Sequence, residues 1–519
     1  MTALATIETP TRTRRIPEHR AVVLITGVLY LAVAIWFWRN HVIPGDSVSR
    51  LANAYYTIFS RDPHLAAIGF VWNPLPSLLL IPFLPFTMLF PALTEESLLA
   101  VLASAALMTA TVGLMHDVLA RVVASRAVRL TLTAAFALHP MTVLYAGNGM
   151  SEACFLFCLL LAVRSLHRWL TEGRVESLVP LGLALALSYG ARYEALAPVA
   201  AVTVLVGAIT WWRAGRNGAL ARTDAVIVGL PGLLAVALWA LASKIIVGQW
   251  FATFSSEYGN SAQVTTAAAD INSVTGDDLG GRLAYWGHQM TGLAPFAAVL
   301  LIAALAAAWR RRDLAVLAPV TVLGSVLAFD AMAFLSGTSF GWLRFHIAVV
   351  PLVVLLAAHL IADTRRTAVT AGTLVLLLAA FPTMVNILGN SNLSREEAQW
   401  VTGSGRFNTA DLHRVNTLVA ADLDAMNLPD GAVLTDVAYS FAVVLASDDP
   451  DQFVITPDRD FTAAAGDPSA HGVQYLLVSA DGSADAVRLA RYGAGPVPPD
   501  NATPYRKADG SVEWFLIRL

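Results

Sequence analysis

The chain is a succession of apolar runs of membrane-spanning length, separated by short polar loops that are rich in arginine. A helix of roughly 20 apolar residues crosses a bilayer core of about 30 Å. Only 14% of the 519 residues are charged, whereas soluble domains carry about 25%. The sequence therefore predicts a polytopic α-helical membrane protein.

The basic loops predict how these runs are oriented. Residues 1–20 are polar and basic, so we expect a cytoplasmic tail, and the run after them lacks a small-residue cleavage site and reads as a retained anchor. Basic loops stay on the cytoplasmic side of a membrane, and eleven spans satisfy that rule for every loop. The expected spans are 21–38, 97–115, 130–146, 153–166, 178–189, 195–212, 226–247, 293–309, 314–335, 345–361 and 367–385.

One further apolar run, residues 73–90, is not expected to cross the membrane. It contains four prolines, and each proline removes a backbone donor that a lipid-exposed helix needs. If both this run and 97–115 crossed, the arginine-rich loop after Met115 would lie outside. We therefore predict that residues 73–90 form a re-entrant or interfacial element.

The predicted organisation has three parts. The tail at 1–20 is followed by a transmembrane module over 21–385, which has two long extracytoplasmic loops, 39–96 and 248–290. From 386 to 519 the chain is more charged and its apolar strings are short, so we expect a small extracytoplasmic α/β domain. A helix is predicted over 412–426 and strands at 433, 453, 475 and 513.

Several classes of function find no support in the composition. The net charge of −3 gives no basic excess for a nucleic-acid partner. Cys154 and Cys158 lie four apart in one apolar run and read as small core residues. His64, His139 and His288 have no ligand-like spacing, so no metal is predicted, and the chain has no nucleotide fingerprint, so no cofactor is predicted.

Charged side chains gather where the predicted spans reach the outer face. A charge at membrane depth is expensive, so such residues are functional candidates. They come from the first loop, from two short turns and from the turn before a late span. The candidates are Asp46, Arg50, Glu152, Arg192, Glu194, Arg344 and His346, and Asp330 lies deeper and needs a partner.

Each candidate also has a structural interpretation. Asp46 follows Pro44-Gly45 and is placed to cap a helix, with Arg50 as its local partner one turn later. Glu152 is also placed at a helix start, and Arg192 with Glu194 would make a local pair. Arg344 is either a snorkelling side chain at a helix end or a phosphate-binding cation.

Aromatic and amide side chains of the first loop form a second group of candidates. Tyr55, Trp72 and Asn73 are expected either at the membrane interface or along an acceptor groove, where aromatic rings stack on sugars. Both interpretations place this loop at the edge of the bilayer.

Five stretches, taken in order, resemble a known family. They are GDSVSRLANAYYTI, VWNPLPSLLLIPF, MSEACFLF, SYGARYEALAP and WLRFHIAVVPLVVLLAA. Together they resemble bacterial GT-C fold glycosyltransferases related to protein mannosyltransferases and aminoarabinose transferases, over roughly residues 20–385. The chain departs from the mannosyltransferase pattern in two places. Ser47 follows Asp46 where that family has an Asp-Glu pair. Trp72-Asn73-Pro74-Leu75 stands where many relatives have a His-Pro-Pro-Leu type string.

The resemblance implies a GT-C-like fold and a polyprenyl-phosphate-linked sugar donor. It maps the catalytic aspartate of the first loop to Asp46, and the arginine associated with the lipid phosphate to Arg344. We expect Asp46 to act as general base in an inverting transfer, with Arg344, His346 and Arg192 holding the phosphate. The acceptor would be a cell-envelope glycan, lipid or protein.

Two other classes of function remain open from the sequence. One is a secondary transporter or flippase of a lipid-linked or anionic substrate, and the other is a non-catalytic scaffold whose C-terminal domain binds a cell-wall polymer. All three classes of function, the glycosyltransferase included, imply a multi-pass protein of the plasma membrane that contacts membrane lipids and has a cytoplasmic N-terminus. The sugar, the acceptor and the oligomeric state stay undetermined.

Overall fold

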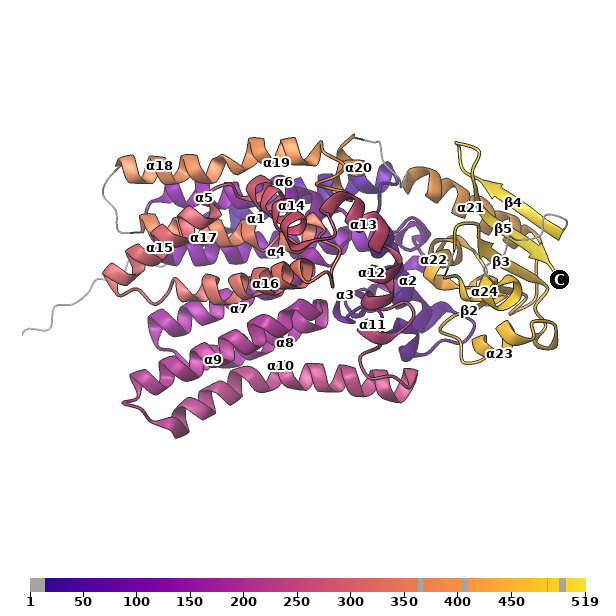
Figure 1. The fold of residues 1–519 in the computed structure, drawn as a ribbon, viewed down its shortest axis with the longest axis horizontal. Helices are drawn as coiled ribbons and strands as arrows, with labels where there is room; N and C mark the ends of the chain where they lie inside the picture. The colour runs from indigo at the N-terminus through magenta and orange to yellow at the C-terminus, as the bar shows by residue number, and fades with distance from the viewer. Residues whose placement is uncertain (1–14, 363–366, 403–408, 483, 494–500) are drawn as a thin grey trace, which may run out of the picture.

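The computed structural model describes residues 15–362, 367–402, 409–482, 484–493 and 501–519. A bundle of long helices forms most of the molecule, and a compact sheet domain lies at one end of it (Figure 1). Residues 1–14 of the predicted tail, with Arg12 and Arg14, lie outside the described residues, as does the predicted basic pair Arg365 and Arg366.

The bundle contains a helix at each of the eleven predicted spans. In the described chain, eight helices are long and apolar enough to cross a membrane, or up to ten if each bent pair counts as one span, and the shorter apolar segment Val175–Ala191 adds to these. This confirms a polytopic helical protein. The bundle helices are α1 (Arg15–Arg39), α4 (Leu98–Val122), α5 (Arg126–Ala137), α6 (Pro140–Gly147), α7 (Glu152–Glu172), α8 (Leu178–Ala191), α9 (Leu196–Arg213), α10 (Gly218–Val247), α15 (Ala297–Arg311), α16 (Leu317–Leu335), α17 (Val349–Ile361), α18 (Thr367–Leu378) and α19 (Ala380–Leu388).

The predicted span 130–146 is not one straight helix. It is divided into α5 and α6, whose axes differ by 58°. Pro140 is the cause, because proline has no N–H for the preceding turn and pushes the residue before it out of the helical region. That residue, His139, has an extended ψ of 131°, and its side chain is buried.

Residues 73–90 contain only short helical turns, as the prolines predict. These are α3 (Leu75–Leu78) and η2 (Ile81–Met88), and η3 (Pro91–Leu93) follows them. Several large apolar side chains of this segment are exposed, among them Phe83, Phe86 and Met88. The segment therefore presents an apolar surface without crossing the bundle.

Two long loops cover the end of the bundle that faces the sheet domain. The first contains α2 (Gly45–Phe59) and η1 (Leu65–Ile68) in addition to α3, η2 and η3. The second contains α11 (Ala252–Ser255), α12 (Asn260–Thr266), α13 (Ala268–Thr275) and α14 (Leu279–Leu293). Figure 1 shows both loops between the bundle and the sheet.

The C-terminal part is an α/β domain, as predicted. Its five-stranded sheet has the order β2-β1-β3-β5-β4, in which β1, β2 and β3 are parallel and β5 is antiparallel to both of its neighbours. The strands are β1 (Val433–Thr435), β2 (Phe453–Ile455), β3 (Tyr475–Ser479), β4 (Ala502–Arg506) and β5 (Val512–Arg518). The helices are α21 (Thr409–Ala425), α22 (Val437–Ala446), α23 (Phe461–Gly466) and α24 (Ala486–Tyr492), with η7 (Pro450–Gln452) and η8 (Ser469–His471) between them.

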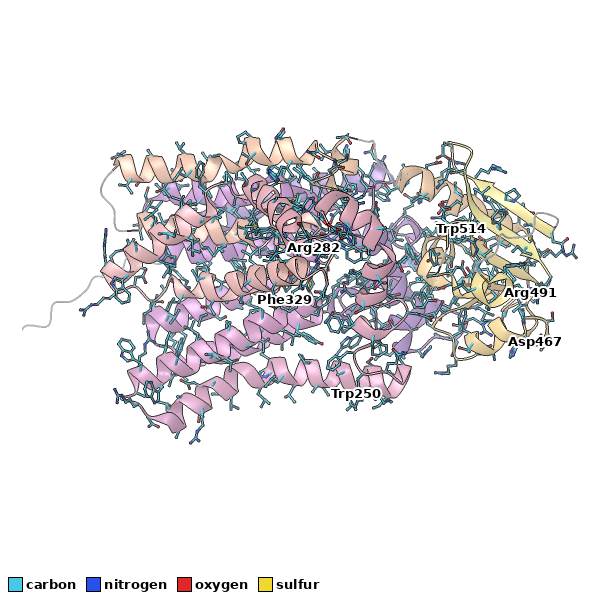
Figure 2. All side chains as sticks on the ribbon, in the orientation of Figure 1. Trp250, Arg282, Phe329, Asp467, Arg491 and Trp514 are labelled. Atoms are coloured by element: carbon cyan, nitrogen blue, oxygen red, sulfur yellow. The ribbon has the colours of Figure 1, made fainter. Side chains whose placement is uncertain are left out.

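One strand was not predicted. β4 contains Pro504 and lacks an apolar run. It is an edge strand, where a proline, which has no N–H, does not interrupt the hydrogen bonds of the sheet interior. Trp514 of the neighbouring β5, labelled in Figure 2, is buried. It donates its indole N–H to Asn416 Oδ1 of α21 at 2.8 Å. The sheet is thereby fixed to α21.

The C-terminal domain is packed on the first loop through a shared apolar core. Leu51 and Tyr56 of α2 lie in one cluster with Val443 of α22 and Phe453 of β2. Around this core, Arg61 pairs with Asp458 at 3.1 Å and with Asp460, and Arg459 pairs with Asp62 at 3.0 Å. The domain therefore holds α2 in place.

The short loops that carry arginines lie at the opposite end of the bundle from the C-terminal domain (Figure 1). We call this the basic end. It includes the ends of α4, α7, α9 and α15, which contribute Arg121, Arg168, Arg213 and Arg310. All the described basic loops thus share one end, which is the arrangement that the parity of the predicted spans requires.

Cysteine accessibility tests this two-sided arrangement. Ser125 lies at the basic end and Thr265 in the second long loop, both exposed, and the native Cys154 and Cys158 are buried. In intact cells, a membrane-impermeant maleimide is expected to label the Thr265→Cys variant, and to label Ser125→Cys only after the cells are broken. Labelling of both variants from the same side would contradict the topology.

Candidate active site

A pocket lies where the two long loops meet the end of the bundle. It is lined by segments from the first loop, the turn after α8, the second loop and the turn before α17. Seven of the ten residues selected from the sequence line it, namely Asp46, Arg50, Trp72, Asn73, Arg192, Glu194 and Arg344. The fold therefore brings together side chains that are far apart in the sequence.

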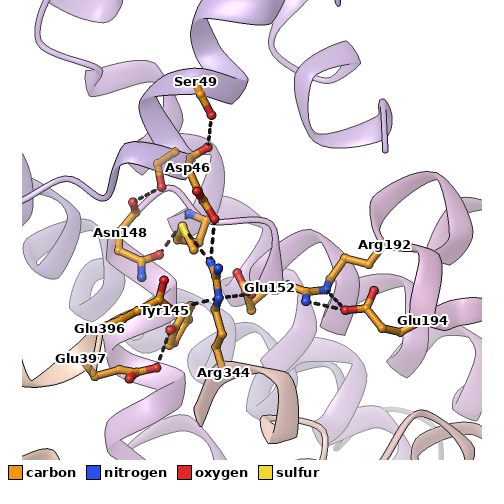
Figure 3. Close-up of polar contacts among 12 residues, drawn as sticks. Asp46, Ser49, Tyr145, Asn148, Glu152, Arg192, Glu194, Arg344, Glu396 and Glu397 are labelled. Atoms are coloured by element: carbon orange, nitrogen blue, oxygen red, sulfur yellow. Dashed lines mark hydrogen bonds and ion pairs between the residues drawn. The ribbon is translucent and has the colours of Figure 1, made fainter. Parts of the chain in front are cut away.

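Asp46 is positioned by the start of α2. Pro44 stands at the N-cap in an extended conformation, and the Asp46 side chain makes no capping bond, so the capping interpretation was wrong. Instead its Oδ2 accepts a hydrogen bond from Nη1 of Arg344 at 2.9 Å (Figure 3). Ser47 fixes the turn by donating to the carbonyl of Asn148 at 2.8 Å.

The Asn148 turn needs a glycine beside it. Gly149 has φ +79°, and a Cβ there would meet the Cβ atoms of Ser47 and Ala100 at 3.1 Å. Any larger residue would be strained in this conformation and would also push α2 away from α4. This glycine therefore allows the close approach that holds Asp46 over the bundle.

Arg344 comes from η6 (Leu343–His346), a short turn before α17. Gly341 has φ +66° and packs so closely on Phe334 that a Cβ would overlap the ring. The guanidinium lies over the Trp342 ring, 4.4 Å from its centroid, and the side chain is buried. The turn thus places a desolvated cation against the pocket.

Three carboxylates surround Arg344. Besides Asp46, the Oε2 atom of Glu396 lies 3.0 Å from its Nε, and the Oε1 atom of Glu152 lies at 3.9 Å (Figure 3). Glu396 was not predicted, because it follows the last span in a polar stretch without a periodic signal. Burial raises the pKa of Glu396 above its ordinary value, and Arg344 opposes that shift.

A second ion group lies beside the first. Arg192 pairs with Glu152 and, at 2.5 Å, with Glu194; both carboxylates are buried, and the Arg192 side chain is 11% exposed. Its guanidinium also faces the ring of Phe345 at 5.1 Å. Glu152 links the two groups, because it contacts both arginines. The predicted pair of Arg192 and Glu194 is therefore present, but it belongs to a larger network.

Arg50 differs from the other two arginines of the pocket. Its Nε and Nη1 atoms are buried and have no hydrogen-bond partner among the described residues, and the expected pair with Asp46 is not formed there. The guanidinium stacks over the Trp72 ring at 4.7 Å. Burial lowers the pKa of Arg50 to about 10, although Asp46 and Glu152 oppose the shift. Within the described chain, Arg50 is thus a buried cation without a bonded anion.

Three of the predicted residues lie outside the pocket wall. Glu152 is buried behind it. His346 is buried against Trp286, with ring centroids 6.4 Å apart, and neither ring nitrogen has a partner in the described chain. Tyr55 stacks on Phe59 in the core shared with the C-terminal domain and does not line an acceptor groove.

Asn73 and Trp72 do line the pocket, and other lining residues were missed. Asn73 donates to the carbonyl of Tyr189 at 2.6 Å, which ties the prolyl segment to α8. The second loop contributes Asn260 and Gln263, and the rest of the wall is largely aromatic, with Tyr193, Phe340, Trp342 and Phe345. In the sequence, only the length of the second loop indicated that it could contribute to the pocket wall.

The pocket therefore combines two carboxylates with cations and aromatic rings. In the described residues, no three His, Cys, Asp or Glu side chains are grouped as metal ligands. These groups can exchange a proton with a substrate hydroxyl and can bind an anion. Aromatic faces suit an apolar or sugar surface.

Comparisons with known proteins find only distant likeness, and it is to solved structures. No family model matches the chain, and no curated protein matches it. Among solved structures, it is similar to the archaeal oligosaccharyltransferase AglB from Archaeoglobus fulgidus, in complex with an inhibitory peptide and a dolichol-phosphate. The identity is 12% and the TM-score 0.44, over 97% of this chain and 74% of that chain. A likeness this remote carries no argument about the site, whose function rests on its own geometry.

Replacing Arg192 tests the energetics of the ion network. The variant Arg192→Met leaves Glu194 buried without its cation and leaves Glu152 with only the longer contact to Arg344. We therefore expect a loss of about 3–5 kcal/mol in the free energy of unfolding. Unfolding of the purified protein in detergent measures the change. Arg222 is exposed and outside the network, so Arg222→Met should change stability by no more than about 0.5 kcal/mol. Equal effects of the two variants would contradict the network's structural role.

Proposed function

We propose that this protein is an inverting glycosyltransferase that moves a sugar from a polyprenyl-phosphate donor to an extracytoplasmic acceptor hydroxyl, with Asp46 as the general base. The exposure of Asp46 is the observation that carries the proposal. Of the two carboxylates that line the pocket, the side chain of Asp46 is 27% exposed and that of Glu194 only 4%. Asp46 is therefore the carboxylate that a substrate hydroxyl reaches.

The proposed reaction is one displacement. The acceptor oxygen forms a bond to the anomeric carbon while the bond from that carbon to the phosphate oxygen breaks. The acceptor proton passes to the Asp46 carboxylate. The leaving polyprenyl phosphate gains one negative charge, so the pocket must stabilise an anion that grows during the step. Because one displacement is enough, the anomeric configuration inverts.

Arg50 is the strongest candidate for binding that anion. Arg344 and Arg192 are already neutralised by carboxylates, so a phosphate must compete with those carboxylates for either of them. Arg50 has no bonded carboxylate in the described chain and lies one turn from Asp46 on α2. Arg344 holds the Asp46 carboxylate in one orientation and offers a second, shared cation.

The prolyl segment supports a lipid-linked donor. It is joined to α8 next to Arg192 through Asn73, and several of its large apolar side chains, among them Phe83, Phe86 and Met88, are exposed. An isoprenoid tail would contact this surface and stay in the bilayer while its head group enters the pocket. We place the pocket on the extracytoplasmic face, at the end of the bundle away from the basic loops.

The position of the charges favours a transfer site over a transporter. Transporters bind their substrates near the bilayer midplane, between broken helices. Here the charged network lies at helix ends and in turns (Figure 3). Binding without turnover by the unaltered protein would favour the transporter.

The substitution Asp46→Asn tests the general base. It keeps the shape of the side chain and removes the basic oxygen, so we expect the rate of sugar transfer to fall about 10²- to 10⁴-fold. The assay follows sugar release from a polyprenyl-phosphate-sugar pool by the purified, folded protein. Asp62 is in the same loop and pairs at the surface with Arg459, so Asp62→Asn should retain activity. Undiminished transfer by Asp46→Asn would overturn the assignment.

The substitution Arg50→Gln separates binding from folding. Loss of charged hydrogen bonds to the phosphate should reduce kcat/KM by roughly 10- to 100-fold. Stability should stay unchanged or rise, because the variant removes a buried cation that has no bonded partner in the described chain. The same unfolding measurement as for Arg192→Met checks this. A large loss of stability with normal kcat/KM would contradict a role in anion binding.

A further inference from the structure

A second pocket lies at the basic end of the bundle, remote from the candidate active site. Its walls come from the start of α1, the second half of α4, the start of α5 and the middle of α7. We call it the basic groove. The residues used below are Arg20, Val23, Ala110, Leu114, Phe157 and Arg164.

The deeper wall of the groove is apolar and faces the outside of the bundle. Val23, Leu114 and Phe157 are all partly exposed there. The same stretch of α1 continues into Leu24 and Ile25, each 69% exposed. Exposed apolar side chains on a membrane-spanning helix contact lipid tails. The groove is therefore open to the bilayer.

The length of the groove suits one lipid chain. Its α4 wall extends from Ala110 to Ala120, which is about 15 Å at a rise of 1.5 Å per residue. The charged members of the lining lie toward the loop end of this wall, and the apolar members lie deeper. That order matches a phospholipid, whose head group stays at the membrane surface.

The acids of the groove are already neutralised. Glu18 accepts two hydrogen bonds from Arg129, both at 2.8 Å, and lies 3.3 Å from His116. Asp117 is shared by Arg164 at 2.6 Å and Arg121 at 3.4 Å.

Positive charge is in excess at the mouth of the groove. Arg20 is exposed there and makes no hydrogen bond or ion pair to any residue that the structure describes. Arg126, three quarters exposed, is 3.4 Å from Glu18, which Arg129 already neutralises. The mouth of the groove therefore attracts an anion.

We propose that the basic groove binds one anionic phospholipid, with its phosphate at Arg20 and one acyl chain along Val23, Leu114 and Phe157. The site is independent of the transfer reaction and lies at the other end of the molecule. The apolar wall selects a lipid over free phosphate, and the excess of arginine selects an anionic head group over a zwitterionic one.

Native mass spectrometry of the full chain in detergent tests the proposal. Phosphatidylglycerol and phosphatidylcholine are added at equal concentration, and the fraction of protein that retains each lipid is measured. We expect one phosphatidylglycerol per chain, retained at least about fivefold better than phosphatidylcholine, because each arginine near a head group changes affinity by about that factor. Equal retention of the two lipids would overturn the proposal.

Two variants locate the site. Arg20→Glu should lower retention of phosphatidylglycerol by at least about fivefold, and Ala110→Trp should fill the groove and abolish it. Arg222→Glu is the matched control, since Arg222 is also exposed near the start of a bundle helix, α10, but lies outside the groove. An equal effect of Arg222→Glu, or normal retention by a folded Ala110→Trp protein, would contradict the assignment.

A soluble head group distinguishes a lipid site from a phosphate site. Glycerol 3-phosphate carries the anion without acyl chains, so excess glycerol 3-phosphate should leave the bound phosphatidylglycerol in place. Displacement at concentrations similar to those of the lipid would assign the groove to a free phosphate ester and overturn the lipid proposal. Thermal unfolding of each variant confirms that it is folded.

Discussion

The candidate site depends on one buried guanidinium, that of Arg344. A cation at this depth is stable only if carboxylates and hydrogen bonds replace the water it has lost. Asp46 supplies one from the first loop and Glu396 another from the segment after the last bundle helix, and Glu152 lies close by. The same ion pairs that keep Arg344 in the protein therefore fix the first loop and the connection to the C-terminal domain against the helices.

The three arginines of the pocket divide into two kinds. Arg344 and Arg192 are bonded to carboxylates and hold the architecture together. Arg50 has two buried nitrogens without a partner among the described residues, and that imbalance costs stability unless an anion binds. An unpaired cation beside a partly exposed carboxylate fits the donor that we propose, which carries a phosphate next to its reactive carbon. The C-terminal domain contributes by packing on α2, which carries Asp46 and Arg50.

Local patterns predicted the frame of the protein and missed its exceptions. The spans, the broken prolyl segment and four of the five strands follow from hydropathy, proline content and alternation. The bend at His139 was missed because one apolar run does not reveal where a helix breaks. β4 was missed because Pro504 is unfavourable everywhere except at an edge, and edges are decided by strand order.

The sequence by itself determined which segments are apolar enough to be helices in a membrane, and that their basic loops share one end. These properties are local, since hydropathy and charge are summed along the chain. The tertiary structure alone decided which charges meet. Asp46 and Arg344 are 298 positions apart, and Tyr55, on the same helix as Asp46, turns to a different core. Pairing depends on distance in space and on which groups are desolvated together, and neither is encoded in the spacing of residues.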